Sequence, residues 1–295
     1  MKNILIIAVS IALSVVVTTT FFSGSKNPRI EQKDTAYERV IRTNTLRCGF
    51  GSWEPGIIRN PRTNEMEGLF VEMLSEIAKI AKLNIEWTQE VDWGQISVAL
   101  QSQKVDAFCA GMAADAVRAK KIAYTKPLSF WRFDAIVRAD DKRFPENTVL
   151  SIDDFNKSAF KTSYTEGDVL ETIKQTELPL TQGIPLPPLG TPADNLANVL
   201  TGKTDFVVFP RVMLQNYKKT NPDGNLRFVE LKTPLRLYGN VLAVDIHEQE
   251  LRSFLDAAIT EFVQSGSYKR IMEKYNGQYP LSFLSVADQY KENAN

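Results

Sequence analysis

Apolar blocks suited to buried strands alternate with apolar residues at helical spacing along most of this chain. Residues 46–50 suit a short buried strand, and apolar side chains within 70–81 then recur at the three- and four-residue steps of one helix face. The same alternation continues to about residue 277. Strands that alternate with helices favour parallel sheets covered by helices, which places the chain in the α/β class.

The alternation falls into two similar series. The first predicts strands at 46–50, 85–88 and 105–110 and helices at 70–81, 96–100 and 114–121. The second predicts strands at 160–164, 205–209 and 226–231, helices that begin at Asp168 and Thr191, and a helix that ends at Tyr217. A last strand at 238–245 and a helix at 251–262 are expected to return to the first series.

Two series in a chain of 295 residues predict two lobes, each a mostly parallel sheet flanked by helices. Lobe 1 is expected to combine residues 45–137 with 239–280, and lobe 2 to span 138–238. The segments 134–138 and 238–244 would then cross between the lobes. Two crossing segments of this kind make a hinge.

Residues 1–25 have the pattern of a secretory signal. Lys2 precedes an uncharged run at 4–22, and small polar residues follow it. Cleavage after this segment would leave residues 26–44 as a polar spacer. An uncleaved membrane anchor stays open as the alternative, because the run is nearly long enough to span a bilayer. Either outcome predicts an exported, periplasmic protein.

Charge and residue content exclude several kinds of partner. Lys plus Arg and Asp plus Glu both number 35, so the chain has no cationic excess with which to bind nucleic acid. The only histidine, His247, and the two cysteines, Cys48 and Cys109, do not have the spacing of a zinc site. We therefore expect no nucleic acid, no metal and no cofactor, and a monomer.

The two cysteines fall on strands that are expected to be neighbours. An oxidising compartment could join Cys48 to Cys109, so a disulfide stays open. Bridges between adjacent parallel strands are geometrically awkward, however. Two buried free thiols are the favoured prediction.

Three stretches of sequence carry a further signal. The first is GLFVEML at 68–74, and the third is GSYKRI at 266–271. The second holds DW at 92–93, KVDA at 104–107, AGM at 110–112, RAKK at 118–121 and YTKP at 124–127. With these stretches the chain resembles, over about residues 46–277, the polar amino-acid-binding family of bacterial solute-binding proteins, family 3 of the periplasmic binding proteins. The match is imperfect at Phe70, where the family usually carries an acid.

This resemblance implies a type II, Venus-flytrap fold that closes on a ligand. The ligand would be a small carboxylate-bearing molecule, either amino-acid-like or an organic acid. The partner would be the membrane permease of an ABC transporter.

Arg118 is the first candidate for holding the carboxylate. The predicted helix at 114–121 would place it near a helix N-terminus at the carboxyl end of the sheet, where open α/β sheets bind ligands. A guanidinium offers two parallel donors to a carboxylate. In the family that the chain resembles, this arginine grips the ligand's α-carboxylate. A surface ion pair with Asp115 is the alternative role.

Two tryptophans match positions where the family places rings that sandwich the ligand's side chain. Trp93 directly precedes Gly94 at an expected strand-to-helix turn, and Trp53 lies in a loop after the first strand. A flat ring gives apolar contact at low entropic cost and can also hold a cation. Core packing is the alternative role for both rings. Gly111 and Met112, shortly before Arg118, are expected to line the same site.

Two departures from the family pattern bear on the ligand. Ala113 stands where the family has a hydroxyl that helps to hold the carboxylate, and Pro210 stands where it has an acid for the ligand's amine. A buried ammonium without a partner is costly. Either Glu166 or Asp168 replaces the missing acid, or the ligand has no amine, in which case organic acids or modified amino acids bind best. Helix capping is the alternative role for Asp168.

Other functions remain as alternatives. Some proteins with this fold are dehydratases that act on prephenate or arogenate, and Arg118 and Glu166 could serve such chemistry. The sequence has no paired carboxylates, metal cluster or Ser-His arrangement, so binding without catalysis is the prediction. A sensor module is a third possibility if the N-terminal segment is an anchor. The tail, 281–295, has no assigned role.

Overall fold

The computed structural model of the protein describes residues 34–146, 148–187 and 190–285. The chain divides into a short N-terminal unit, residues 1–35, and a main unit, 36–295, whose fold follows. The predicted signal or anchor segment, 1–25, lies outside the described residues. Among the described residues, no helix has both the length and the apolar character that are needed to span a bilayer.

One ten-stranded sheet runs through the main unit. Its strands are β1 (Thr45–Phe50), β4 (Asn84–Glu90), β5 (Ala107–Ala113), β6 (Ile122–Tyr124), β7 (Ser129–Arg138), β8 (Lys161–Thr165), β9 (Gln182–Leu186), β10 (Phe206–Pro210), β11 (Leu226–Val229) and β12 (Arg236–Asp245). Their order is β4-β1-β5-β12-β7-β10-β8-β9, with β6 beside β12 and β11 beside β7. A separate pair joins β2 (Ile58–Arg59) to β3 (Met66–Glu67).

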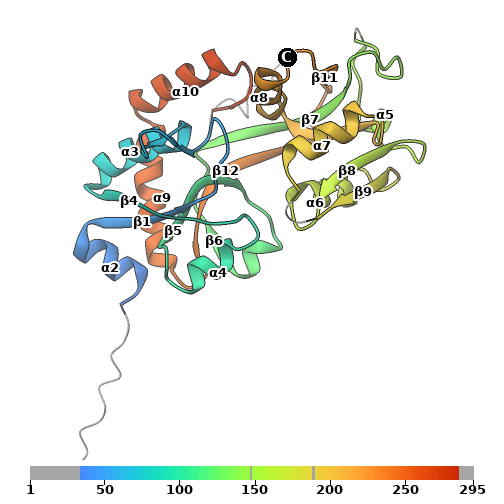
Figure 1. The fold of residues 1–295 in the computed structure, drawn as a ribbon. Helices are drawn as coiled ribbons and strands as arrows, with labels where there is room; N and C mark the ends of the chain where they lie inside the picture. Colours follow the sequence, from blue (N-terminus) through green and yellow to red (C-terminus); the bar gives the residue numbers. More distant parts are fainter. Residues whose placement is uncertain (1–33, 147, 188–189, 286–295) are drawn as a thin grey trace, which may run out of the picture. The chain divides into compact units, whose positions relative to one another are not determined.

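Strands β7 and β12 connect two parallel groups of strands (Figure 1). Strands β4, β1 and β5 are parallel, as are β10, β8 and β9. We call the part around β4, β1, β5 and β6 lobe 1, and the part around β8, β9, β10 and β11 lobe 2. The two crossing strands pair antiparallel from Phe133 opposite Arg236 to Ser129 opposite Asn240. They contain the segments that the sequence predicts to cross between lobes.

Helices cover both lobes, as the α/β prediction requires. They are α3 (Leu69–Ala81), α4 (Ile96–Gln101), α5 (Ile152–Phe155), α6 (Val169–Thr176), α7 (Pro192–Leu200), α8 (Arg211–Thr220), α9 (Gln249–Val263) and α10 (Gly266–Gln278). Helix α3 packs against α9 and α10 on lobe 1, and α7 packs against α8 on lobe 2. Thr191 caps α7 as predicted, because its hydroxyl accepts from Asp194 N–H while the Asp194 carboxylate accepts from Thr191 N–H.

Helix α2 (Ala36–Thr43) lies within the region that the sequence predicts as a spacer. Ala36 and Val40 are buried one helical turn apart. The Glu248 carboxylate accepts hydrogen bonds from the N–H groups of Ala36 at 2.7 Å and Tyr37 at 3.3 Å. These donors would otherwise be unsatisfied in the first turn. A distant carboxylate therefore caps this helix, which its own sequence does not reveal.

The predicted helix at 114–121 is wrong. Strand β5 continues to Ala113 and β6 begins at Ile122, so the residues between them must reverse the chain. Only a single 3-10 turn forms, at Arg118–Lys120. The Asp115 carboxylate accepts a hydrogen bond from Arg118 N–H at 2.8 Å, which stabilises this turn. Arg118 therefore does not gain the helix N-terminus that the sequence argument assigned to it.

The favoured prediction of two free thiols is also wrong, because Cys48 and Cys109 form a disulfide between β1 and β5. Cys48 lies opposite Ala107, and Cys109 is two residues further along β5 on the same face. Their Cα atoms are 5.6 Å apart, a separation that a disulfide can bridge. Bridges between adjacent parallel strands were expected to be geometrically awkward. This pair is diagonal, and β1 is irregular between Cys48 and Gly49.

We expect the disulfide to contribute about 2 to 4 kcal/mol to the free energy of unfolding, because it closes a long loop in the unfolded chain. Urea denaturation of a Cys48→Ala/Cys109→Ala variant should show a loss of this size relative to the oxidised protein. Reduced wild-type protein is the control and should behave like the variant. Alkylation of two thiols in the unreduced, denatured protein would contradict the assignment.

Candidate functional site

A pocket of about 250 Å³ lies between lobe 1 and lobe 2. Lobe 1 contributes the turn after β5, with Asp115, Val117 and Arg118. Lobe 2 contributes the start of α6 and its exposed face, with Gly167, Asp168, Val169, Glu171, Thr172 and Gln175. The structure therefore brings together Arg118 and Asp168, two of the residues predicted for the site, which are distant in sequence and on different lobes.

Arg118 bridges the two lobes. Its Nη2 donates to the carbonyl oxygen of Gly167 at 3.2 Å, and its Nε lies 3.3 Å from Asp115 Oδ2. The predicted ion pair with Asp115 thus exists, but the guanidinium also reaches lobe 2. Gly167 has φ +75, a left-handed conformation that glycine adopts without strain.

Asp115 positions Arg118 in the turn. Besides its two contacts with Arg118, its Oδ2 accepts a hydrogen bond from the Tyr124 hydroxyl at 3.4 Å. Burial is the main cause that raises the pKa of Tyr124 to about 12, so this hydroxyl stays protonated and remains a donor at neutral pH. Asp115 was considered in the sequence only as an alternative partner for Arg118, and the part played by Tyr124 was missed.

Asp168 is the N-cap of α6, and its carboxylate accepts from the N–H of Val169. Burial raises the pKa of the Asp168 carboxyl above its usual value, although the Val169 N–H and the charge of Arg118 oppose this rise. Helix capping and a place in the pocket therefore coexist at Asp168. A half-buried acid with a perturbed pKa in a cleft is a candidate for function.

Glu166, the other acid proposed from sequence, is separated from this pocket. Its side chain is exposed, and its backbone N–H donates to Leu186 in the ladder between β8 and β9. It is not among the residues that line the pocket. Of the two acids, only Asp168 lies beside Arg118.

Trp53 belongs to an aromatic run that continues onto the crossing strands. Its indole N–H donates to the carbonyl oxygen of Ala110 at 2.9 Å, and its ring packs edge to face against Trp131 with 4.9 Å between the ring centroids. The Phe133 ring centroid lies 6.3 Å from that of Trp131 and 5.3 Å from that of Tyr238. Burial is the main cause that raises the pKa of Tyr238. The run therefore starts in a lobe 1 loop and ends on β12.

Trp131 and Tyr238 were not predicted as site residues, because 238–244 was interpreted only as a crossing segment and the other crossing segment, 134–138, begins after Trp131. Aromatic rings at 131 and 133 alternate along β7 and so point to one face of the sheet. That spacing was the available signal. The pairing of Trp131 opposite Tyr238 across the two strands depends on register, which the sequence does not reveal.

Trp93 lies apart from the pocket that contains Arg118. It is 37% exposed, and its ring packs edge to face against Phe108 with 5.3 Å between the ring centroids. A Cβ added at Gly51 would lie 2.9 Å from the Trp93 ring, so the ring rests against that glycine. The residues that line the Arg118 pocket do not include Trp93.

Gly111, Met112 and Ala113 form the buried end of β5 that leads into the Arg118 turn. Gly111 has φ +63, and a Cβ there would lie 2.1 Å from the ring of Phe70. Phe70 also packs against Trp53, with 5.8 Å between the ring centroids. An acid at position 70 would lose both contacts, which accounts for this departure from the family pattern.

Pro210 is the buried N-cap of α8 and provides no side-chain cap to the helix. The next residue, Arg211, lies over the Phe228 ring at 4.3 Å and 3.6 Å from the carboxylate of Glu230. The start of α8 is therefore cationic. It has no acid in its first turn that could hold an amine.

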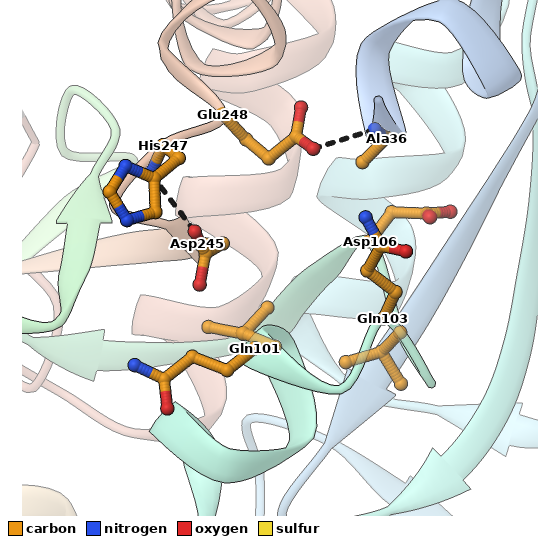
Figure 2. Close-up of a pocket in the computed structure, with 9 residues that line it drawn as sticks. Ala36, Gln101, Gln103, Asp106, Asp245, His247 and Glu248 are labelled. Atoms are coloured by element: carbon orange, nitrogen blue, oxygen red, sulfur yellow. Dashed lines mark hydrogen bonds between the residues drawn. The ribbon is translucent and has the colours of Figure 1, made fainter. Parts of the chain in front are cut away.

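A larger cavity, of about 330 Å³, lies beside α2, at Gln101, Asp245, His247 and Glu248 among others (Figure 2). Its carboxylates already have partners in the fold. Glu248 caps α2, Asp245 accepts from the N–H of His247 at 3.0 Å, and the buried Asp106 pairs with Arg39 and Arg47. We therefore assign this cavity to the attachment of α2 and not to ligand binding.

In the part of the chain that the structure describes, no group of three or more His, Cys, Asp or Glu side chains is arranged to hold a metal ion. His247 is exposed in the loop after β12.

Comparisons with solved structures identify the fold. An ancestral amino acid-binding protein, AncCDT-1, described as a precursor of cyclohexadienyl dehydratase, is 20% identical with a TM-score of 0.66, over 82% of this chain and 99% of that one. The amino acid ABC transporter substrate-binding protein AbpA from Streptococcus pneumoniae, bound to L-arginine, is 18% identical with a TM-score of 0.62, over 80% and 96%. A histidine kinase sensor domain similar to periplasmic binding proteins is 21% identical with a TM-score of 0.66, over 82% and 97%.

At these identities the likeness concerns the fold alone, and it confirms the predicted two-lobed periplasmic-binding-protein fold. A search of curated proteins finds no significant match. The family model for bacterial extracellular solute-binding proteins, family 3, matches residues 46–278, which is most of the chain and includes both sides of the Arg118 pocket. The chain belongs to the family 3 bacterial extracellular solute-binding proteins.

Proposed function

We propose that this protein captures a small, carboxylate-bearing, amino-acid-like ligand between its lobes. The observation that carries the proposal is the pocket in which Arg118 of lobe 1 meets Gly167 and Asp168 of lobe 2. Membership of a solute-binding family supports ligand capture. The L-arginine bound to the similar protein AbpA supports an amino-acid-like ligand.

Arg118 would hold the ligand's carboxylate. Arg118 Nη2 donates to the Gly167 carbonyl oxygen, a neutral acceptor. A carboxylate would form stronger, charge-assisted hydrogen bonds with the same guanidinium. Asp115 would keep the Nε edge in place while the Nη groups turn to the ligand. Ala113, which has no hydroxyl, would leave Arg118 as the main group for the carboxylate.

Asp168 would hold the ligand's amine in place of the acid that Pro210 lacks. Burial disfavours the ionised form of Asp168, and a ligand ammonium would restore a favourable partner for that charge. The pocket lining also contains three carboxylates, from Asp115, Asp168 and Glu171, against the single guanidinium of Arg118. A ligand with a second carboxylate would meet repulsion there. We therefore favour a zwitterion over the organic acids that the sequence argument preferred.

The remaining parts of the predicted site keep a role in this proposal. Trp53 and Trp131 are not among the residues that line the Arg118 pocket. Their edge-to-face pair would give the ligand's side chain an aromatic surface only if closure brings it nearer to that pocket. Trp93 and Glu166 would take part only if closure brings them nearer to the pocket.

Delivery to the membrane permease of an ABC transporter, by a periplasmic monomer, completes the proposal. It rests on the family, whose members are extracellular solute-binding proteins. Export would depend on residues 1–25, which have the pattern of a secretory signal.

An enzyme that dehydrates prephenate or arogenate stays as the alternative. The similar protein AncCDT-1 is described as a precursor of cyclohexadienyl dehydratase and as an amino acid-binding protein. A pocket with one arginine and three carboxylates suits recognition of a zwitterion better than two carboxylates on one substrate.

A thermal-shift screen tests the ligand class. We expect a standard amino acid to give a larger shift than any dicarboxylate in a panel of the twenty amino acids and small organic acids. A ligand at about one hundred times its dissociation constant stabilises the folded protein by about 2.7 kcal/mol. In Arg118→Ala we expect affinity for that amino acid to fall by the equivalent of about 2 to 5 kcal/mol.

The matched control is Arg62→Ala, which removes an exposed guanidinium in lobe 1 and should leave the shift unchanged. Unaltered affinity in Arg118→Ala would sink the carboxylate assignment. If an organic acid gives the largest thermal shift, the result would instead favour the interpretation drawn from Pro210, that the ligand has no amine. Prephenate and arogenate belong in the panel, because their conversion to product would replace binding with catalysis.

Asp168→Asn should make the ligand-free protein more stable at neutral pH. Burial raises the folded-state pKa of Asp168, so its ionised carboxylate lowers the free energy of unfolding at pH 7. As the pH falls through the raised pKa, the folded protein takes up a proton and this penalty disappears. The melting temperature of Asp168→Asn should therefore exceed that of wild type at pH 7, by a margin that shrinks towards about pH 4, the ordinary pKa of an aspartate.

Asparagine is also a good N-cap, so α6 should be retained in this variant. Glu166→Gln removes an exposed carboxylate two residues away and should change neither the melting temperature nor its dependence on pH. A lower melting temperature for Asp168→Asn at pH 7 would mean that Arg118 and the cap stabilise the ionised carboxylate outright.

A further inference from the structure

A second set of contacts between the lobes lies away from Arg118, where α8 of lobe 2 meets Glu54 of lobe 1. Lys219 Nζ lies 3.3 Å from Glu54 Oε1, and the side-chain amide of Asn216 donates to the Glu54 carbonyl oxygen. The hydroxyl of Tyr279, which follows α10, donates to the same Glu54 Oε1 at 3.2 Å and accepts from Lys219. The Lys219 ammonium also lies 4.2 Å from the centre of the Tyr279 ring.

Glu54 lies at the tip of a loop that is firmly part of lobe 1. Trp53 and Ile57 exchange two backbone hydrogen bonds across this loop, at 2.8 and 2.9 Å. The backbone carbonyl oxygens of Pro55 and Gly56 accept from the first residues of α3, at 2.9 Å each. The Trp53 ring folds over Gly56, where a Cβ would lie 2.0 Å from the ring. A bond from α8 to Glu54 is therefore a bond to lobe 1.

Helix α8 is equally firmly part of lobe 2, because it packs on β10, β11 and the lobe 2 end of β7. A second pair of contacts lies nearer to the crossing strands. Gln215 donates to the Pro280 carbonyl oxygen at 3.1 Å and accepts from the Ser282 hydroxyl at 2.7 Å. The segment that holds Pro280 continues to Leu284, which pairs with Phe130 of β7. These contacts lie beside the hinge, whereas the Glu54 contacts lie beside Trp53.

We propose that Lys219, Glu54 and Tyr279 form a latch that favours the closed arrangement of the lobes independently of any ligand. The latch would act through closure and would not touch the ligand. Its value to the protein rests on the proposed function, since a protein that captures a ligand gains affinity when its closed form is already populated.

The latch is polar and half-exposed, with 50% of the Lys219 side chain and 52% of the Glu54 side chain accessible to solvent. An ion pair of this exposure shifts an equilibrium modestly. We expect its loss to change the ratio of closed to open molecules by about two- to fivefold, which corresponds to about 0.4 to 1 kcal/mol. Such a strength would suit a lobe that must open again to release what it binds.

The test measures the distance between the lobes in the ligand-free protein. Cysteines introduced at Val98 on α4 and at Leu180 before β9, which are 59% and 63% exposed, would carry spin labels on lobe 1 and lobe 2. The native Cys48 and Cys109 are joined and buried, so they should not react with the label. Double electron–electron resonance then gives the distribution of distances in each variant.

We expect Lys219→Met and Glu54→Gln each to increase the population at long distance, and the double variant to match the single ones, because they break one shared contact. Lys219→Arg, which keeps the positive charge, should show the same short distance between the labels as wild type. Lys218→Met is the matched control: it removes the neighbouring, exposed ammonium of the same helix and should behave like wild type. Raising the ionic strength from about 0.05 to 0.5 M should open wild type and leave Lys219→Met unchanged.

Identical distributions in wild type and Lys219→Met would overturn the latch, as would equal opening in Lys218→Met. Because no ligand is added, failure of the latch leaves the binding role of Arg118 standing. Conversely, loss of the Arg118 assignment in the ligand screen leaves this test unaffected.

Discussion

The antiparallel pairing of β7 with β12 is the contact on which the rest of the structure depends. Each strand joins one lobe at one end and the other lobe at the other end, so the ladder from Phe133 opposite Arg236 to Ser129 opposite Asn240 holds both lobes in one sheet. A buried hydrogen bond of 2.9 Å from Asn240 to the Ser129 hydroxyl supports it from within. Two strands can bend and twist without losing their pairing, so this ladder can act as a hinge while it connects the two lobes.

The candidate site takes its geometry from this ladder. The Arg118 turn is fixed at both ends, because β5 and β6 both pair with β12. On the other side, the loop that carries Gly167 and Asp168 follows β8, which is linked through β10 to β7. Rotation about the crossing strands therefore changes the separation of Arg118 from Asp168 while leaving each within a rigid lobe. The two groups proposed to hold opposite ends of a zwitterion lie on opposite sides of that motion.

Local pattern was enough to predict the α/β fold, the crossing segments and the start of α7, because each depends on residues close in sequence. The errors share a different cause. The disulfide depends on a diagonal register between β1 and β5, the reversal at Asp115 depends on where β6 pairs, and α2 depends on a cap from Glu248. Trp131 was missed for the same reason, since only strand pairing sets it beside Trp53 and opposite Tyr238. Periodicity and spacing could place Trp131 on one face of its strand, but only the non-local contacts show which residues lie beside it.

Native mass spectrometry of the protein purified from its own host tests the central claim most directly. Capture of a small zwitterion between the lobes predicts one adduct per chain, of the mass of an amino acid or a close derivative, that is released when the protein is unfolded. The adduct should be absent from Arg118→Ala purified in the same way and should return to stripped wild-type protein when it is added back. A wild-type protein that carries no adduct and takes up none from a host extract, or an adduct that persists in Arg118→Ala, would contradict the account.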